Sequence, residues 1–314
     1  MNENIRDLKN YFKIIVVGIV CACLNFLIFS CASTKNASSV KLVQEVINQD
    51  KINQDKNAQS ESESSPEETE KKPHYPENFK INPNVKPNDY REECFIREPN
   101  IMKYEGDERY TYRLGMDISR HDKRVNWKKA KKSGREFVFL RIGWTGYQSG
   151  IIHTDERFHK NIKGALKAGF DVGVYYFSQA INEEEAIAEA RNVIKDLEPY
   201  TIQLPVVYDP ESIPWEWART DDLTSEQVMK NTIAFCNEIK NAGYEPMIYS
   251  NLNWEVNYFD LEQLQEYKIW YADYREVPKT PYHFEFLQYD GEAVEIPGVK
   301  RKCDGDIQLI RISE

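Results

Sequence analysis

The sequence predicts an α/β fold, a TIM-like barrel with reduced outer helices. Between residues 113 and 310, short apolar runs of strand type alternate with segments whose apolar residues recur at helical spacing. Eight strand candidates fall in this region, the number that a (β/α) barrel needs. Helical segments are scarce between the later strands, so we expect several outer helices to be missing. An open doubly wound sheet is the alternative, although no GxGxxG or P-loop motif accompanies it.

Strands and helices alternate one to one in the first half of this region. Glycines follow the first two predicted helices, at Gly134 and Gly169, where glycine commonly ends a helix. In the third helix, Ala186, Ala190 and Val193 recur at the spacing of a buried helical face. The predicted strands cover residues 114–119, 137–144, 171–178 and 204–211, and the predicted helices cover residues 127–132, 158–168 and 183–197.

The second half of the region is richer in strands than in helices. Residues 224–227, Thr-Ser-Glu-Gln, have the pattern of a capping box and predict the start of a helix. Met229, Ile233 and Cys236 would lie on one face of that helix, which Gly243 would end. Strand candidates follow at residues 246–251, 268–274, 284–289 and 306–310, with one short helix candidate at residues 261–267.

Residues 1–31 have the pattern of a secretory signal, since basic residues precede the apolar run 14–29 and small residues flank Cys31. The segment Ile28-Phe29-Ser30-Cys31 resembles the lipobox of a bacterial lipoprotein, with Phe29 bulkier than usual at its position. The resemblance implies a lipid on Cys31; an ordinary signal peptide and an uncleaved anchor are the alternatives. In each case the domain is exported. A lipid or an uncleaved signal would hold it on a membrane, at the cell surface or facing the periplasm.

Three segments are expected after the signal. Residues 32–90 are predicted to be a disordered polar linker, because Ser, Glu, Lys, Asn, Gln and Pro dominate and little can be buried. Such a linker would hold a domain away from a membrane. Residues 91–112 contain three tyrosines and are expected to form an N-terminal extension that packs on the barrel. Residues 113–314 would form the barrel domain.

Charge and cysteine usage exclude two kinds of function. The formal net charge is −10 and no basic stripe is present, which argues against a nucleic-acid partner. Beyond the signal, the cysteines are Cys94, Cys236 and Cys303, and no CxxC or Cys/His spacing predicts a zinc site. Cys236 is expected in the core. Cys94 and Cys303 bracket the folded region, and a disulfide between them is one alternative in an oxidising compartment.

The stretch 204–211, Leu-Pro-Val-Val-Tyr-Asp-Pro-Glu, combines a buried-strand pattern with two acids at its end. On a strand, Asp209 and Glu211 would face the same way, with Cα atoms roughly 6.6 Å apart. Pro210 cannot donate a ladder hydrogen bond, which suits a strand's end. Paired carboxylates there suggest acid/base chemistry. The alternative is an Asp that caps the next helix beside a solvated Glu.

The carboxyl ends of the predicted strands carry acids, amides and aromatic side chains, and in a barrel these ends meet at one face. Acids surrounded by aromatics suit a carbohydrate site, where rings pack on sugars, amides bind hydroxyls and two carboxylates perform acid/base catalysis. The region's four histidines have no partnered Ser or Cys motif, which argues against a His-based triad. The residues at these ends are Asp117, Trp144, Tyr176, Asp209, Glu211, Tyr249, Asn251, Trp270 and Gln288.

Five motifs occur in order along residues 113–310. They are Gly115-Met116-Asp117-Ile118-Ser119, Gly173-Val174-Tyr175-Tyr176-Phe177, Pro205-Val206-Val207-Tyr208-Asp209-Pro210-Glu211, Gly243-Tyr244-Glu245-Pro246-Met247-Ile248-Tyr249-Ser250-Asn251 and Trp270-Tyr271-Ala272-Asp273-Tyr274, followed by Gln288-Tyr289 and Asp304. With these motifs the region resembles the family-25 glycoside hydrolases, the Chalaropsis-type lysozymes. The resemblance implies hydrolysis of the β-1,4 bond between N-acetylmuramic acid and N-acetylglucosamine in peptidoglycan.

The resemblance also implies roles for four acids. Glu211 would be the general acid/base, and Asp209 would orient the substrate's acetamido group as it attacks the anomeric carbon. Asp117 and Asp304 would hold these two acids in place and favour the protonated form of Glu211. Participation by the acetamide implies retention of configuration. The resemblance implies neither a metal nor another cofactor.

Seven further residues are candidates for substrate binding: Tyr175, Tyr176, Tyr249, Asn251, Trp270, Gln288 and Arg141. For several of them a structural role is the alternative. Trp270 and Tyr175 would then be barrel core, Tyr249 and Asn251 would shape the turn after their strand, and Arg141 would form an ion pair.

The chain departs from the family pattern at two places. Leu287 stands where the family often has Trp, and residues 303–306, Cys-Asp-Gly-Asp, replace a Val-Asp-Leu-Asn type sequence. The expected partner is peptidoglycan, and we expect a monomer. A non-catalytic peptidoglycan-binding lipoprotein on the same scaffold is the alternative function. A glycosidase acting on chitin-like polymers is a third.

Overall fold

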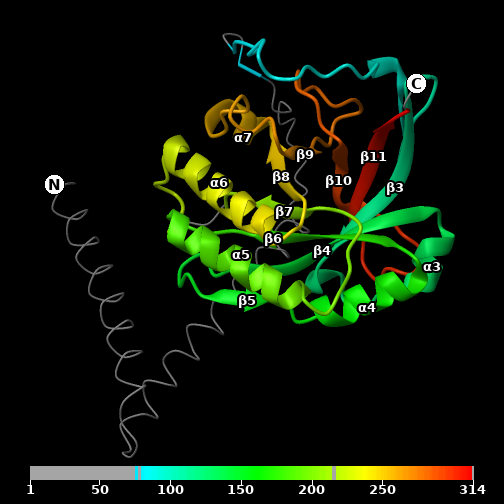
Figure 1. Ribbon diagram of the computed structural model, residues 1–314. Helices are drawn as coiled ribbons and strands as arrows, with labels where there is room; N and C mark the ends of the chain where they lie inside the picture. The colour runs from blue at the N-terminus through cyan, green and yellow to red at the C-terminus, as the bar shows by residue number, and fades with distance from the viewer. Residues whose placement is uncertain (1–74, 77–78, 214–216, 313–314) are drawn as a thin grey trace, which may run out of the picture. The chain divides into compact units, whose positions relative to one another are not determined.

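A closed barrel forms the centre of the molecule in our computed structural model (Figure 1), which describes residues 75–76, 79–213 and 217–312. The predicted signal segment with Cys31, and the linker up to residue 74, lie outside these residues. Within the described residues, eight strands close the barrel: β3 (Tyr110–Ile118), β4 (Arg135–Thr145), β6 (Asp171–Phe177), β7 (Val206–Asp209), β8 (Pro246–Asn251), β9 (Lys268–Ala272), β10 (Phe286–Val294) and β11 (Cys303–Arg311). The predicted fold class is confirmed.

Pairing between the first two barrel strands, β3 and β4, closes the sheet and rules out the open-sheet alternative. From β3 through β4, β6, β7, β8, β9 and β10, neighbours are parallel. The last strand, β11, runs antiparallel to both β10 and β3. A short strand, β5 (Ile152–Thr154), extends the sheet beside β4. The closing strand therefore returns through a hairpin instead of a crossover helix.

Four helices match their predicted positions: α3 (Trp127–Lys132), α4 (Phe158–Ala168), α5 (Glu183–Leu197) and α6 (Ser225–Asn241). Thr224 caps α6 by accepting a hydrogen bond from the Gln227 backbone at 3.2 Å, and Gly169 ends α4 at a φ of 80°. A fifth helix, α7 (Leu252–Asn257), was not predicted. The predicted helix at residues 261–267 is wrong, because Leu261, Leu264 and Tyr267 are buried by successive turns.

The strand β7 is shorter than predicted at both ends. It covers Val206–Asp209, because the prolines at 205 and 210 that flank it have no N–H to donate. Glu211 therefore lies beyond the sheet, and the predicted strand alternation from Asp209 to Glu211 is wrong. The position of Glu211 depends instead on contacts outside the ladder.

Apolar side chains form one core inside the barrel and another outside it. The inner core is aromatic-rich and is closed over by the strands: Phe137, Phe139, Val207, Met247, Tyr249, Trp270, Ala272 and Phe286. Gly173 makes room for it, since a Cβ there would lie 2.4 Å from the Phe139 ring. The outer core packs the other face of the strands against the helices and against the N-terminal residues.

The N-terminal residues cover the barrel wall between β9 and β10, where the described chain has no helix. Asn88 donates a backbone hydrogen bond to the Pro281 carbonyl at 2.8 Å, and the Asn82 N–H donates to the Tyr282 hydroxyl at 3.0 Å. Tyr90 is 8% exposed and packs edge-on against Phe95, Tyr104 and Tyr110. Ordered packing thus starts ahead of the expected boundary at residue 90.

After this arm, residues 91–112 contain a 3-10 turn (Glu92–Cys94), an antiparallel hairpin and the start of β3. The hairpin strands are β1 (Phe95–Glu98) and β2 (Ile101–Tyr104). Met102 and Tyr104 are buried in the outer core, so this extension packs on the barrel.

The described cysteines are free thiols. Cys94, Cys236 and Cys303 are all buried without a disulfide, so the pairing of Cys94 with Cys303 is not present. Cys94 lies under the β1–β2 hairpin near Gly106, whereas the Cys303 thiol donates to the Val294 carbonyl at 3.9 Å. Cys236 lies in the outer core, as predicted.

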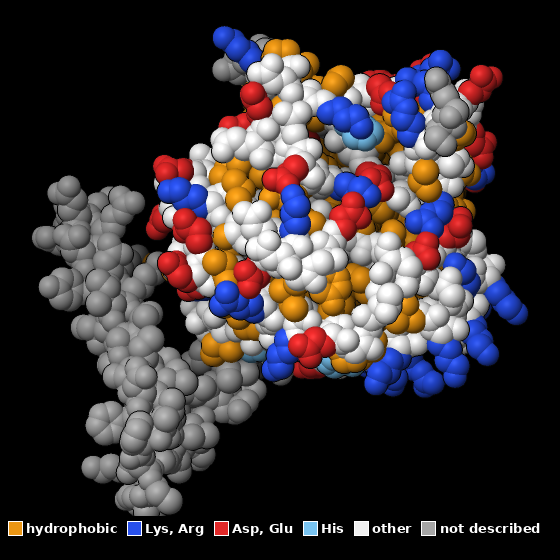
Figure 2. Space-filling view, viewed as in Figure 1, with side chains coloured by type: hydrophobic (Ala, Val, Ile, Leu, Met, Phe, Trp, Pro, Cys, Tyr) orange, Lys and Arg blue, Asp and Glu red, His pale blue; other side chains and the backbone are white. Residues whose placement is uncertain are grey.

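The surface charge is unevenly distributed. Figure 2 shows acidic and basic side chains mixed over α5 and α6, whereas Lys and Arg gather over α3 and α4. The last turn of α3 alone carries Lys129, Lys131 and Lys132. The formal charge of −10 therefore does not describe every face of the barrel. Among residues 75–76, 79–213 and 217–312, no helix combines the length and apolar character needed to cross a bilayer.

We predict that the N-terminal arm contributes to the stability of the barrel. Tyr90→Ala should lower the free energy of unfolding by about 3–5 kcal/mol, because a buried aromatic ring is lost from a packed cluster. Ile81→Ala, in the same arm but 60% exposed, should change it by less than about 0.5 kcal/mol. Urea denaturation of both variants measures the difference. Equal, small effects would show that residues 79–90 behave as a linker.

Candidate active site

Three aspartates meet at the closing seam of the barrel. Asp304 on β11 lies directly opposite Asp117 on β3 in the antiparallel register. Asp306 is two residues further along β11, opposite Gly115, and therefore faces the same side of the sheet. Asp117 is 4% exposed and Asp306 is fully buried. The seam between the first and last strands thus concentrates carboxyl groups at one point.

Neutral hydrogen-bond donors satisfy part of this carboxyl cluster. The Gln288 amide donates to Asp117 Oδ2 at 2.8 Å, and the Trp270 indole donates to Asp306 Oδ1 at 2.9 Å. Burial raises the pKa of Asp117, and the negative charge of Asp306 raises it further. Burial and the charge of Asp304 likewise raise the pKa of Asp306. The cluster therefore binds protons more tightly than solvated aspartates do.

The acids of the central motif lie at and just beyond the end of β7. Asp209 is 4% exposed, and its Oδ1 atom has no hydrogen-bond partner in the described structure. Burial raises the pKa of Asp209, and the negative charge of Glu211 adds to this, while Arg141 opposes it. Glu211 is partly exposed. A buried and an accessible carboxyl thus share one strand end.

Tyrosine and glutamine side chains link the two groups of acids. The hydroxyls of Tyr249 and Tyr274 both donate to Gln288 Oε1, at 2.9 and 2.8 Å. Because the same amide donates to Asp117, it ties two tyrosines to the seam. The charge of Asp117, after burial, raises the pKa of Tyr175, which places this ring among the acids as well.

Three of the predicted binding residues make structural contacts. Tyr176 points out of the barrel, where it bonds Thr145 at 2.9 Å and packs on α6, because neighbours on a strand face opposite sides. Asn251 caps α7 by accepting hydrogen bonds from the Asn253 and Trp254 backbones. Trp270 is 1% exposed and stacks on a phenylalanine of the inner core.

Arg141 forms the ion pair that was the alternative to substrate contact. Its Nε donates to Asp155 Oδ2 at 3.0 Å, and its guanidinium lies 5.0 Å from the centre of the Trp144 ring. The Arg120 guanidinium also lies over this ring, at 4.3 Å. The positive charge of Arg141 nevertheless influences the site, because it acts on the pKa of Asp209.

Two residues of the site were not among the predicted ones. Asp306 was noted only as an added charge, although its spacing of two from Asp304 on a strand places both on one face. Tyr274 is 53% exposed at the rim while its hydroxyl reaches Gln288. It lies two residues beyond β9, which ends at Ala272, whereas the predicted strand ran to residue 274. Among the described residues, no His, Cys, Asp and Glu side chains are grouped to hold a metal ion.

Comparison with known proteins agrees with this architecture. The chain is similar to the modular autolysin LytC from Streptococcus pneumoniae, with 23% identity and a TM-score of 0.56 over 68% of this chain and 51% of that one. It is also similar to the spore cortex lytic enzyme SleM from Clostridium perfringens, with 20% identity and a TM-score of 0.56 over 65% of this chain and 68% of that one. The chain therefore spans about half the length of LytC.

A third solved structure is a bacterial lysozyme from Streptomyces coelicolor, with 22% identity and a TM-score of 0.51 over 62% of this chain and 90% of that one. At these identities the likeness concerns the fold alone. No curated protein sequence matches the chain significantly. The family model described as glycosyl hydrolases family 25 matches residues 116–299, more than half of the chain. The chain belongs to glycosyl hydrolases family 25.

Proposed function

We propose that this protein is a lysozyme-type muramidase that hydrolyses the β-1,4 bond between N-acetylmuramic acid and N-acetylglucosamine in peptidoglycan. One observation carries the proposal. In a family-25 chain, Asp209 ends β7 and Glu211 follows it, at the carboxyl-end face of the barrel where Asp117 and Asp304 form the seam. Paired carboxyl groups at this face are what glycosidic bond cleavage uses.

In the proposed reaction, Glu211 donates a proton to the glycosidic oxygen as the C–O bond breaks. The acetamido oxygen of the substrate attacks the anomeric carbon, and Asp209 orients the acetamide by accepting its N–H. Water, deprotonated by Glu211, then opens the cyclic intermediate with net retention. The partial exposure of Glu211 and the burial of Asp209 fit these roles, because Glu211 has to reach both the leaving oxygen and water.

The remaining acids would act on this pair through the electric field of the site. Asp117 and Asp304 would hold the two motif acids in place, and their negative charge would favour the protonated form of Glu211. Tyr274 offers an exposed ring at the rim on which a sugar face can pack. Tyr249, Tyr175 and Gln288 lie deeper and would hold the acids or contact the acetamide.

A non-catalytic peptidoglycan-binding protein is the competing proposal. Both motif acids, Asp209 and Glu211, are present, and burial raises the pKa of Asp209, which favours an enzyme. A wild-type protein that sediments with insoluble peptidoglycan without clearing it would favour the binding protein. Action on N-acetylglucosamine oligomers instead would favour a chitin-type glycosidase.

We further propose that the barrel is exported and held on a membrane, at the cell surface or facing the periplasm, as a monomer. The support is the signal pattern of residues 1–31, with Cys31 in a lipobox-like position, and the polar composition that follows it.

Glu211→Gln should lower the release of reducing ends from purified peptidoglycan by about 10²–10⁴-fold, because the amide cannot deliver a proton. Mass spectrometry of the wild-type products should identify N-acetylmuramic acid as the new reducing sugar. Glu226→Gln, at an exposed residue that pairs with Lys230 on α6, is the matched control and should be fully active. Wild-type activity in Glu211→Gln would refute the assignment of the acid.

Asp306→Asn should stabilise the protein at neutral pH. The pKa of Asp306 is raised in the folded state, so its contribution to stability is present below the unfolded pKa of about 3.9 and is lost as pH rises through the folded value. Asparagine can still accept from Trp270 but does not ionise. We expect a gain in stability at pH 7 that disappears at about pH 3, below the unfolded pKa. Calorimetry at both values measures it; a gain independent of pH would contradict the cause.

Cys31→Ala should move the protein from the membrane fraction to the soluble fraction of cells that express the full chain. The reason is that the thiol would be the only attachment point of the lipid. Labelling with a radioactive fatty acid should be lost in parallel. Unchanged membrane association without labelling in the wild type would instead favour an uncleaved anchor.

A further inference from the structure

The side chain of a buried glutamine donates a hydrogen bond to the backbone of Glu211. Gln179 follows the end of β6 and is 1% exposed. Its side-chain Nε2 donates to the Glu211 carbonyl at 3.0 Å and to the Ser178 carbonyl at 2.8 Å. Since Glu211 lies beyond the last residue of β7, the sheet ladder does not fix its position. The Gln179 amide supplies a fixed contact in its place.

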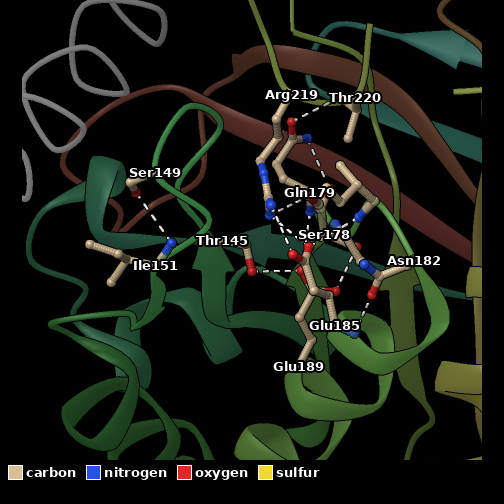
Figure 3. A network of polar contacts seen from close by, with 12 residues as sticks. Thr145, Ser149, Ile151, Ser178, Gln179, Asn182, Glu185, Glu189, Arg219 and Thr220 are labelled. Carbon is tan, nitrogen blue, oxygen red and sulfur yellow. Dashed lines mark hydrogen bonds and ion pairs between the residues drawn. The ribbon is translucent and has the colours of Figure 1, made fainter. Parts of the chain in front are cut away.

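The same side chain also contacts the far end of the segment that begins at Glu211. Gln179 Oε1 accepts a hydrogen bond from Thr220 Oγ1 at 3.1 Å. The neighbouring Arg219 donates to the Gln179 carbonyl at 3.2 Å and forms a two-pronged ion pair with Glu185, at 2.7 and 2.8 Å (Figure 3). One residue thus ties Glu211 and Thr220 to the end of β6.

Gln179 is itself held by a buried carboxyl. Glu189 on α5 is 1% exposed and accepts from the Gln179 backbone N–H at 3.2 Å. It also accepts from the hydroxyls of Thr145 and Ser178, each at 2.6 Å. The Ser178 N–H donates to the Asp209 carbonyl at 2.7 Å, which ties the end of β6 to the end of β7. The backbones on either side of Pro210 are therefore both fixed to residues 178–179.

We propose that Gln179 is a positioning residue that sets where the Glu211 carboxyl lies relative to Asp209 and to the scissile bond. The inference rests on the proposed function, in which Glu211 moves the proton. It assigns to Gln179 no contact with substrate. Its effect passes through the Glu211 peptide group.

An amide is the side chain that this position requires. The observed contacts use Nε2 as a donor to two carbonyls and Oε1 as an acceptor from a hydroxyl. An ionised glutamate would place acceptors against both carbonyls, and methionine has the length of glutamine without a donor. Gln179→Met therefore removes the contacts with little change in volume.

Kinetics on a soluble alternating oligomer of N-acetylglucosamine and N-acetylmuramic acid test the proposal. Gln179→Met should lower kcat by about 10–100-fold with KM within about twofold, since a displaced acid loses rate and not substrate affinity. The pH profile of kcat should also become narrower. In the wild type, repulsion between the Asp209 and Glu211 carboxylates keeps their two pKa values apart. If the Glu211 side chain moves away from Asp209, this repulsion weakens and the two pKa values approach each other. Gln203→Met, an exposed glutamine before β7, is the matched control and should match the wild type.

A second variant covers the case in which Gln179→Met does not fold. Thr220→Val removes one hydrogen bond to Gln179 and should lower kcat by about two- to tenfold, again without a change in KM. A folded Gln179→Met with wild-type kcat, or with a raised KM and unchanged kcat, would overturn the proposal. So would a kcat loss without any narrowing of the pH profile, which a general structural defect would give.

Hydrogen exchange provides a readout that does not depend on activity. Peptides that cover residues 217–223 should exchange faster in Gln179→Met than in the wild type, whereas those of α6 should not change. Unchanged exchange of these peptides would refute the proposal that Gln179 fixes the Glu211 backbone, even if the activity falls. If the wild type is inactive but the exchange difference is observed, the proposed muramidase activity is refuted, whereas the contact of Gln179 with the Glu211 backbone is supported.

Discussion

The burial of several carboxyl groups where the barrel closes is the constraint on which the site depends. Closure pairs β11 antiparallel with β3. This register places Asp304 opposite Asp117, and Asp306 two residues further along β11 on the same face. Each charge taken out of water is costly unless it is paired or neutralised. The barrel meets that cost with the Gln288 amide and the Trp270 indole, and with raised pKa values.

The two motif acids differ because one ends a strand and the other follows it. Asp209 has the rigidity and the burial of the sheet, whereas Glu211 has the access that a proton donor needs. Because Glu211 lies beyond the strand, it makes no ladder hydrogen bonds. The buried amide of Gln179 donates a hydrogen bond to its carbonyl in their place. The position of Glu211 therefore depends on Gln179, which is in turn held by Glu189 on helix α5.

The outer wall of the barrel is completed by unusual means. Helices α4, α5 and α6 cover one part, and the arm before β1 covers the stretch between β9 and β10. Tyr90 and Val85 are buried there in the same core as the helical residues. A barrel with few outer helices needs such a cover, because a strand buried on one face only would leave apolar side chains in water.

Local patterns were sufficient to predict the barrel, four helices and the acids, because periodicity, helix caps and the Asp-Pro-Glu motif are all read from neighbouring residues. They did not separate Tyr175 from Tyr176, although strand alternation sends only one of them inward. Tertiary structure was needed to show that Asp304 lies opposite Asp117 across the closing seam and that Cys94 and Cys303 stay apart. Each of these depends on register or on packing between distant segments, which no local pattern encodes.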